Sequence, residues 1–205
     1  RRHITDSDID ALMDNLTIPR KCEMAATAEM QQIALRHKPH AVCIVPEKRE
    51  ERTTEGGLEV AREENHLAHF IAPLREAGCR VSIFIAADQK QIEAAARIGA
   101  EIIELHVGPY CDALEEGRYD ESNPELERLR EMSAYAHSLG LEAHAGHGLT
   151  YTSVNPIAAF PDVIELSTGP FITGDATISV LAPARRRMPA LMDAPPTPAC
   201  APVLA

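Results

Sequence analysis

Short apolar runs and amphipathic stretches alternate along most of the chain. Continuous apolar runs bounded by turn residues predict buried strands. Six such runs cover residues 20–26, 40–45, 80–85, 101–108, 141–148 and 162–169. Between them, apolar side chains recur at helical spacing, as Ile9, Leu12, Met13 and Leu16 do. The alternation predicts an α/β protein with a parallel sheet and right-handed crossovers.

Capping residues mark where several of the predicted helices begin and end. Thr5 and Asp8 form a capping-box pattern at the start of the first helix. Thr27 and Asp88 suit the N-caps of two further helices, and Gly99 suits a C-cap.

Prolines mark other predicted helix boundaries. Pro73 lies inside the long helical stretch 58–77 and predicts a kink or a break there. Asn-Pro pairs at 123–124 and 155–156 predict two more helix starts. Residues 181–192 carry helical spacing, but two prolines oppose a helix at this position.

Two architectures fit this order of elements: an open doubly wound sheet and a (β/α)8 TIM barrel. No G-x-G-x-x-G or Walker loop follows a predicted strand. Charged residues recur near the carboxyl ends of the predicted strands, namely Glu23, Glu47, Glu104, His106 and His147. In a barrel those ends converge on one site, whereas an open sheet spreads them along an edge. We therefore favour the barrel.

A barrel of this kind takes about 250 residues, so two β/α units are expected to be missing. The chain begins Arg-Arg-His in what reads as a loop, which places the expected deficit at the N-terminus. We predict one TIM-barrel domain over residues 1–192, with its first two β/α units largely absent. The Pro- and Ala-rich segment 193–205 is predicted to be a disordered tail.

Composition narrows the possible partners. The 205 residues include 20 Lys+Arg and 31 Asp+Glu, giving a formal net charge of −11. This charge argues against nucleic acid or an anionic membrane as the main partner, but it permits a small phosphorylated substrate. We expect no membrane span and no signal peptide. Five cysteines without a C-x-x-C pair indicate neither a disulfide framework nor a zinc site, and we predict a cytoplasmic protein.

Glu23 and the pair Glu104 and His106 are the first candidates for chemistry. A carboxylate in an otherwise apolar strand has a raised pKa and suits a general base. The alternative for Glu23 is an outward-facing carboxylate paired with a lysine. Glu104 and His106 are two residues apart, so they point to the same side of a strand, which is the interior in a barrel. Their alternative is a salt-bridged pair in the barrel core.

His147 is the next candidate, because it stands between two glycines at a strand end. Its imidazole titrates near neutral pH, and glycines let a backbone approach a ligand closely. A glycine-rich turn that happens to contain a histidine is the alternative. The T-T-E-G-G segment at 53–57 and the helix start after His3 both suit a phosphate, although many loops resemble them.

Taken together, these stretches resemble the pyridoxine 5′-phosphate synthase family. The matching segments are residues 1–8, 23–27, 38–60, 81–88, 103–110 and 141–151, and the most specific are VPEKR with TTEGG, and AGHGLTY. The resemblance extends from Arg1 to about Met192. It implies a (β/α)8 barrel, usually assembled as a homo-octamer. It also implies condensation of 1-deoxy-D-xylulose 5-phosphate with 3-amino-2-oxopropyl phosphate, with no metal and no organic cofactor.

The resemblance also implies roles for individual residues. Glu23 matches the family's general base, His147 its general acid, and Glu104 a carboxylate that stabilises cationic transition states. Contacts to substrate phosphates are implied for His3, Thr53 and Gly148. At the last strand the family has Gly-His, which grips a phosphate, whereas this chain has Gly169-Pro170 and lacks the N–H of residue 170.

Two other functions remain open from the residues alone. One is a metal-dependent barrel hydrolase that uses Glu23, Glu104, His106 and His147. The sequence contains neither an H-x-H pair nor a cluster of residues with the spacing of metal ligands, which argues against this function. The other is a non-catalytic relic that binds phosphorylated ligands, which the expected missing strands and Pro170 motivate.

Overall fold

Six parallel strands form a single sheet in a computed structural model that describes residues 4–47, 56–179 and 181–194. The strands are β1 Lys21–Met24, β2 Ala41–Ile44, β3 Arg80–Ile85, β4 Ile102–His106, β5 Glu142–Gly146 and β6 Val163–Ser167. Their spatial order follows the sequence from β1 to β6, without the reversal that defines an open doubly wound sheet. All six predicted strands are confirmed.

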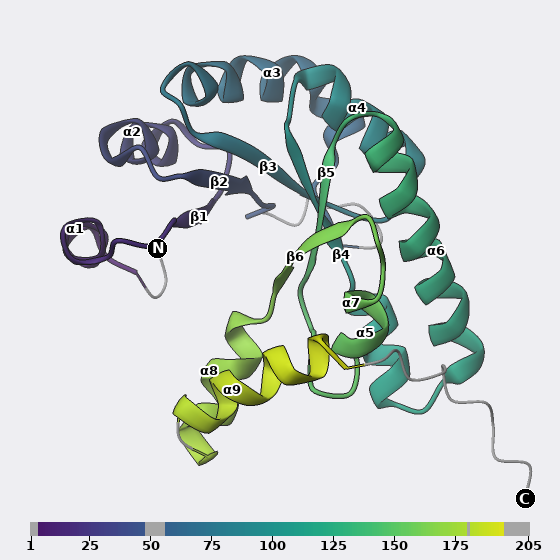
Figure 1. The fold of residues 1–205 in the computed structure, drawn as a ribbon. Helices are drawn as coiled ribbons and strands as arrows, with labels where there is room; N and C mark the ends of the chain where they lie inside the picture. Colours follow the sequence, from purple (N-terminus) through teal and green to yellow (C-terminus); the bar gives the residue numbers. More distant parts are fainter. Residues whose placement is uncertain (1–3, 48–55, 180, 195–205) are drawn as a thin grey trace, which may run out of the picture.

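The helices are α1 Asp6–Asn15, α2 Ala28–His37, α3 Val60–Glu76, α4 Gln89–Ile98, α5 Gly108–Glu115, α6 Tyr119–Ser138, α7 Val154–Ala158, α8 Gly169–Ser179 and α9 Leu181–Met192. Helices α1 to α4 and α6 form an arc around the outside of the sheet, while α8 and α9 pack against each other beyond β6 (Figure 1). None of the described helices is long and apolar enough to cross a membrane.

The curl of the sheet is visible in contacts between strands that are not neighbours. The Lys21 ammonium of β1 forms ion pairs with Glu104 of β4 and with Glu165 of β6. Because β1 and β6 are the two edges of this sheet, such contacts require the edges to bend toward one another. The described chain is therefore an α/β fold with a curled half-barrel of parallel strands.

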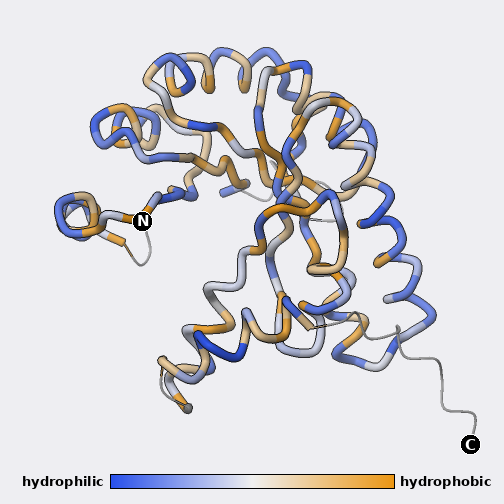
Figure 2. The backbone as a smooth tube through the Cα atoms, in the orientation of Figure 1, coloured by the Kyte–Doolittle hydropathy of each residue, from blue (hydrophilic) through white to orange (hydrophobic). Residues whose placement is uncertain are grey.

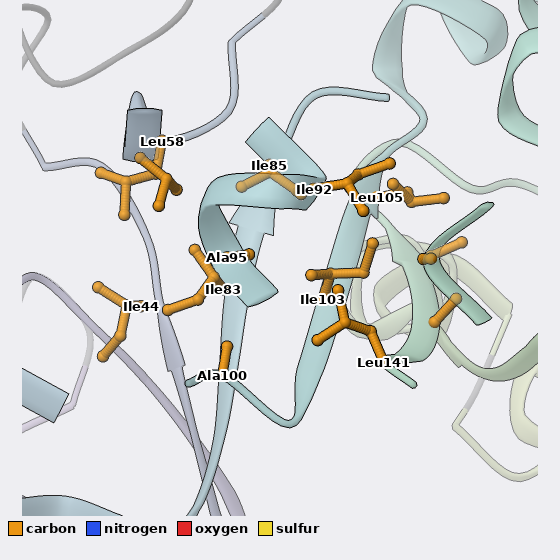
Figure 3. Packing of buried hydrophobic residues seen from close by; sticks show 14 of the residues in the cluster. Ile44, Leu58, Ile83, Ile85, Ile92, Ala95, Ala100, Ile103, Leu105 and Leu141 are labelled. Carbon is orange, nitrogen blue, oxygen red and sulfur yellow. The ribbon is translucent and has the colours of Figure 1, made fainter. Parts of the chain in front are cut away.

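The two faces of the sheet differ in chemistry because side chains alternate along each strand. The outer face packs apolar side chains against the helices, among them Val42, Ile44, Val81, Ile83, Ile85, Ile103 and Leu105. Figure 3 shows this layer, with Ile83 and Ile103 of the sheet close to Ile92 and Ala95 of α4. Hydrophobic segments concentrate on the strands in Figure 2. Burying one such side chain contributes about 1.5–3 kcal/mol, so this layer supplies most of the cohesion.

The inner face is polar. The register aligns Glu23 with Cys43 and Ser82 on neighbouring strands, and it aligns Glu104 with His144 and Glu165. Arg80, Glu142 and His144 are linked in a chain of hydrogen bonds on this face. The hydrophobic pattern of the sequence therefore reflects the packing of the outer face on the helices. The candidate functional residues lie on the inner face.

The predicted helix caps are confirmed. Thr5 and Asp8 form a reciprocal capping box, and the side chains of Thr27 and Asp88 accept hydrogen bonds from the first turns of α2 and α4. Gly99 ends α4 in the left-handed conformation, at φ 86°.

Three predictions about proline need correction. Helix α3 continues through Pro73, and its irregular residue is Glu63. Helix α6 begins at Tyr119, one turn before Asn123-Pro124, and its first turn is held by hydrogen bonds to the carbonyl of Arg118. The prolines in 181–192 do not prevent α9, which buries Ala184 and Met188. Of the predicted tail 193–205, residues 195–205 lie outside the described residues.

Candidate active site

Three of the predicted catalytic residues come together at the carboxyl end of the sheet. Glu23 is the third residue of β1, Glu104 is the third residue of β4, and His147 directly follows β5. Glu23 and Glu104 both lie on the inner face, as the period-two pattern predicts. The charge of Glu23 interacts with both Glu104 and His147, so the curl of the sheet brings all three into one electrostatic neighbourhood.

Glu104 is the buried member of this group, with 3% of its surface exposed. Its Oε2 accepts a hydrogen bond from Lys21 Nζ at 3.1 Å, and the thiol of Cys43 lies 3.9 Å from the same oxygen. Its Oε1 packs against Gly146, where any side chain would collide with it. Both carboxylate oxygens are therefore held by their surroundings. The alternative, a salt bridge between Glu104 and His106, is wrong, because the ion pair that Glu104 forms among the described residues is with Lys21.

Glu23 is exposed at the rim of the concave face, and its carboxylate forms no ion pair with another described residue. Partial burial by the surrounding protein raises its pKa, and the negative charge of Glu104 raises it further. Lys21 and His147 partly offset this rise. A carboxylate with a raised pKa that faces the site is suited to accept a proton at neutral pH. The alternative for Glu23, a carboxylate paired with a lysine, is wrong, because Lys21 instead binds Glu104 and Glu165.

His147 has a backbone conformation that is unusual for a residue with a side chain, at φ 74°. Strained conformations of this kind are often found at functional sites. The His147 ring lies 4.8 Å from the ring of His106 and 5.9 Å from that of Phe84, measured between centroids. Gly108 gives both imidazoles room, since a Cβ at that position would lie 2.7 Å from His106 Nε2. The turn therefore presents His147 above the strand ends, next to a second imidazole.

The loop that follows His147 is held by hydrogen bonds to α5 and α8 and within the loop itself. Thr150 donates to Glu115 of α5 at 2.7 Å, and the Thr150 N–H donates to Ser153 Oγ at 2.9 Å. The Tyr151 hydroxyl donates to Asp175 of α8 at 2.8 Å. These contacts connect the turn of His147 and Gly148 to α5 and α8.

The structure describes some of the residues that are predicted to contact phosphate. Gly148 is exposed at φ 97°, directly after His147, and its backbone is accessible. Gly169 and Pro170 begin α8, immediately beyond β6, so this position is a helix N-terminus at the same edge of the sheet. His3 and Thr53 lie outside the described residues. Of the T-T-E-G-G segment, the structure describes Gly56 and Gly57. A Cβ at Gly56 would lie 3.1 Å from His106 Cε1, and one at Gly57 would collide with the backbone at the end of β3, so these two glycines lie close against the strand ends.

Several residues of the site carry no signal that sequence reasoning used. Lys21 precedes Glu23 by two positions, so the alternation of side chains along a strand could have predicted that both lie on the same face. Phe84 lies next to both imidazoles, with its ring 5.2 Å from that of His106 and 5.9 Å from that of His147. Gly146 and Gly108 serve by leaving space, which only the folded structure reveals.

No group of three His, Cys, Asp or Glu side chains in the described residues is arranged to hold a metal ion. The groups present at the site are instead those that move protons and stabilise charge: two carboxylates, two imidazoles and one ammonium. These features define an α/β protein with a candidate acid–base site at the carboxyl edge of a curled parallel sheet.

The chain belongs to the family described as pyridoxal phosphate biosynthesis protein PdxJ, whose sequence model matches residues 1–194. It is 72% identical over 194 residues to "Pyridoxine 5'-phosphate synthase" of Roseobacter denitrificans, covering 95% of this chain and 78% of that protein. The protein of the same name from Ruegeria pomeroyi is 72% identical over 193 residues, with 94% and 78% covered. That from Cereibacter sphaeroides is 60% identical over 198 residues, with 95% and 79% covered.

A solved structure of a xylose isomerase domain protein from Planctomyces limnophilus superimposes with a TM-score of 0.53 at 15% identity. The match covers 84% of this chain and 71% of that one. At this identity the likeness concerns the fold alone.

Proposed function

We propose that this chain acts as a pyridoxine 5′-phosphate synthase. The reaction condenses 1-deoxy-D-xylulose 5-phosphate with 3-amino-2-oxopropyl phosphate and releases pyridoxine 5′-phosphate, inorganic phosphate and water. The observation that carries the proposal is the grouping of Glu23, Glu104 and His147 at one edge of the sheet, in a chain 72% identical to relatives with that name. The chemistry is imine formation, dehydration and proton transfer, and it needs acids and bases at fixed positions.

The proposed roles follow from the environment of each residue. Glu23 removes protons, because its pKa is raised and its carboxylate faces the site. His147 donates protons to leaving oxygens from the exposed turn above the strand ends. Glu104 is buried and held at both oxygens, so it stabilises positive charge that develops beside it and does not need to move.

Phosphate recognition is proposed for backbone groups. The N–H of Gly148 takes one phosphate, because a glycine at this position lets the anion approach closely. The N-terminus of α8 at Gly169 takes the other, although Pro170 supplies no N–H there. His3 and Thr53 complete the set in this proposal. The relic hypothesis predicts phosphate binding without turnover, and Pro170 is the feature that favours it.

We further propose that the curled sheet is part of a (β/α)8 barrel that two more β/α units close between β6 and β1. The polar inner face and the approach of the edge strands through Lys21 and Glu165 support this proposal. We also propose that the protein is cytoplasmic and assembles as a homo-octamer. Exposed apolar side chains on β6, α8 and α9, namely Ile164, Ile178 and Leu181, provide surface that closing units or other subunits would cover.

The test is product formation by the complete protein, as encoded together with any sequence upstream of Arg1 and verified by intact mass. Both substrates are supplied, and pyridoxine 5′-phosphate is identified by chromatography and mass spectrometry. Glu23→Gln serves as the inactive control. Phosphate-ester binding without any product would overturn the enzyme proposal and favour the relic, and native mass spectrometry of the same sample tests the octamer.

A further inference from the structure

Lys21 is the one ammonium group described among the inner-face residues, and three side chains from two other strands meet it. Its Nζ donates to Glu104 Oε2 at 3.1 Å and to Glu165 Oε1, and it lies 3.5 Å from Ser167 Oγ. Burial lowers the pKa of Lys21, but the charges of Glu104 and Glu165 outweigh this effect and raise it above its usual value. Lys21 therefore stays charged throughout the neutral range.

The two carboxylates that bind Lys21 differ in their need for it. The Glu104 side chain is 4% exposed, whereas the Glu165 side chain is 51% exposed. A buried carboxylate requires a counter-charge and hydrogen bonds, while an exposed one is solvated by water. Among the described residues, the ion pair of Glu104 is with Lys21, and the only other polar group at its Oε2 is the weak thiol donor of Cys43.

The other oxygen of Glu104 completes the geometry. Oε1 lies against Gly146 at the end of β5, immediately before His147. Lys21 therefore binds one oxygen of the carboxylate, while the other oxygen lies next to Gly146, the residue that precedes His147.

We propose that Lys21 is a positioning residue for Glu104: it binds Oε2, balances the buried charge, and so presents Oε1 to the reacting centre. The inference rests on the proposed function, because it assigns Lys21 a part in the same reaction. Lys21 acts through Glu104 and does not itself bind substrate. A purely structural role, in which Lys21 clamps the edge strands β1 and β6 together through Glu165, makes different predictions.

The experiment compares Lys21→Met with Glu165→Gln in the complete protein, with Lys90→Met on the surface of α4 as the matched control. Lys21→Met is expected to lower kcat by about 10- to 100-fold, the size of effect that a misplaced catalytic group produces, with KM changed less than about threefold. Glu165→Gln and Lys90→Met are expected to leave kcat within about twofold. Lys21→Arg, which restores the charge, is expected to retain more activity than Lys21→Met.

A double variant separates positioning from clamping, and a pH profile records the direct effect of the Lys21 charge on Glu23. In a Glu104→Gln background, Lys21→Met is expected to have no additional effect on kcat, because its target is already lost. The charged groups that act on Glu23 are Lys21, Glu104 and His147. Removing the positive charge of Lys21 raises the pKa of Glu23, so the acidic limb of the kcat/KM profile is expected to move to higher pH.

The proposal is overturned if Lys21→Met keeps kcat within threefold, or if Glu165→Gln loses as much as Lys21→Met. It is also overturned if Lys21→Met lowers kcat by the same factor in the Glu104→Gln variant as it does in the unmodified protein. Should Lys21→Met not fold, Lys21→Gln replaces it, because the amide retains a donor without the charge. If the unmodified protein forms no product, the proposed function fails. The pairing of Lys21 with Glu104 is then tested by a double-mutant cycle on the free energy of unfolding, in which a coupling no larger than that with Glu165 rejects it.

Discussion

The Glu104 carboxylate occupies the space in which a side chain at position 146 would begin. Gly146 has an ordinary backbone conformation, so the glycine is needed for its lack of volume and not for its freedom of rotation. A Cβ there would also lie 2.8 Å from Ser167 Cβ on β6. Gly146 on β5 thus leaves room for a carboxylate of the neighbouring strand β4.

Replacing Gly146 with alanine is expected to abolish most activity. The new methyl group collides with Glu104 Oε1, and the carboxylate must turn away from its position beside Lys21. Overpacking of this kind costs about 1–3 kcal/mol of stability, and displacing a catalytic group by about 1 Å costs roughly 100-fold in rate. Product formation and thermal unfolding measure the two effects.

The matched control is Gly174→Ala on the exposed surface of α8, where a Cβ meets nothing. Alanine is the better helix former, so this variant is expected to be unchanged in activity and equal or higher in stability. Gly146→Ala with normal turnover would show that Glu104 either tolerates displacement or has no part in the reaction.

Replacing Glu23 with glutamine is expected to eliminate turnover while making the protein more stable at neutral pH. Because its pKa is raised in the folded state, ionised Glu23 opposes folding above that pKa. The amide removes this penalty. The stability difference between the two proteins should shrink as the pH falls through the raised pKa of folded Glu23, and it should vanish below the ordinary pKa of 4.5, where Glu23 is protonated in both the folded and the unfolded state. Chemical denaturation at several pH values measures it.

Glu29→Gln on α2 is a suitable control, since it removes an exposed carboxylate of the same type away from the strand ends. Glu29→Gln is expected to keep full turnover, so a loss that is confined to Glu23→Gln does not come from removing a carboxylate in general. A Glu23→Gln protein that still forms product at a near-normal rate would disprove the role of general base, whatever its stability.

Removing metal ions is expected to leave the reaction rate unchanged. The proposed chemistry uses carboxylates and an imidazole, and the described residues contain no metal-binding group of three ligands. The measurement is the turnover rate before and after dialysis against a chelator, together with elemental analysis of the protein. A rate that falls with the chelator and returns with one divalent ion would support the metal-dependent hydrolase alternative instead.

The strands were predictable because one face of each is apolar and packs on helices. That face contains Ile83, Ile103 and Leu105. Such residues produce short apolar runs in the sequence, from which strands can be predicted. The inner face was predictable only in part. Period two placed Glu104 and His106 on the same side, but the contact of Lys21 with Glu104 joins residues 83 positions apart. Such contacts depend on how far the sheet curls, which no local pattern encodes.

The helices that sequence reasoning missed share one cause. Both α5 and α8 begin with Gly-Pro, at 108–109 and 169–170, and this pair reads as the end of a strand followed by a turn. Proline is tolerated in the first turn of a helix, where its missing N–H has no partner to lose. In a barrel-type fold the helix starts right after the strand, so a strand-end motif and a helix start coincide at the residues of the site.

Two non-glycine residues among those described have positive φ, His147 at 74° and Lys38 at 46°. In this region a side chain costs about 1–2 kcal/mol relative to glycine. His147→Gly is therefore expected to be more stable than His147→Ala, while both lose about 100-fold or more in turnover because the general acid is gone. Lys38, the C-cap of α2, provides the control: Lys38→Gly should be more stable than Lys38→Ala in the same way, with full activity in both.

The comparison within each pair isolates backbone strain, since glycine and alanine both lack the original functional group. If His147→Gly unfolds at a lower temperature than His147→Ala, while the Lys38 pair behaves as expected, the turn at 147 is not strained in the working protein. If backbone strain is found at both positions, turnover is expected to fall in the His147 variants alone. The backbone strain at residue 147 is then the cost of holding its imidazole above the strand ends, with its ring 4.8 Å from that of His106. In an unstrained backbone conformation, the side chain would point in another direction.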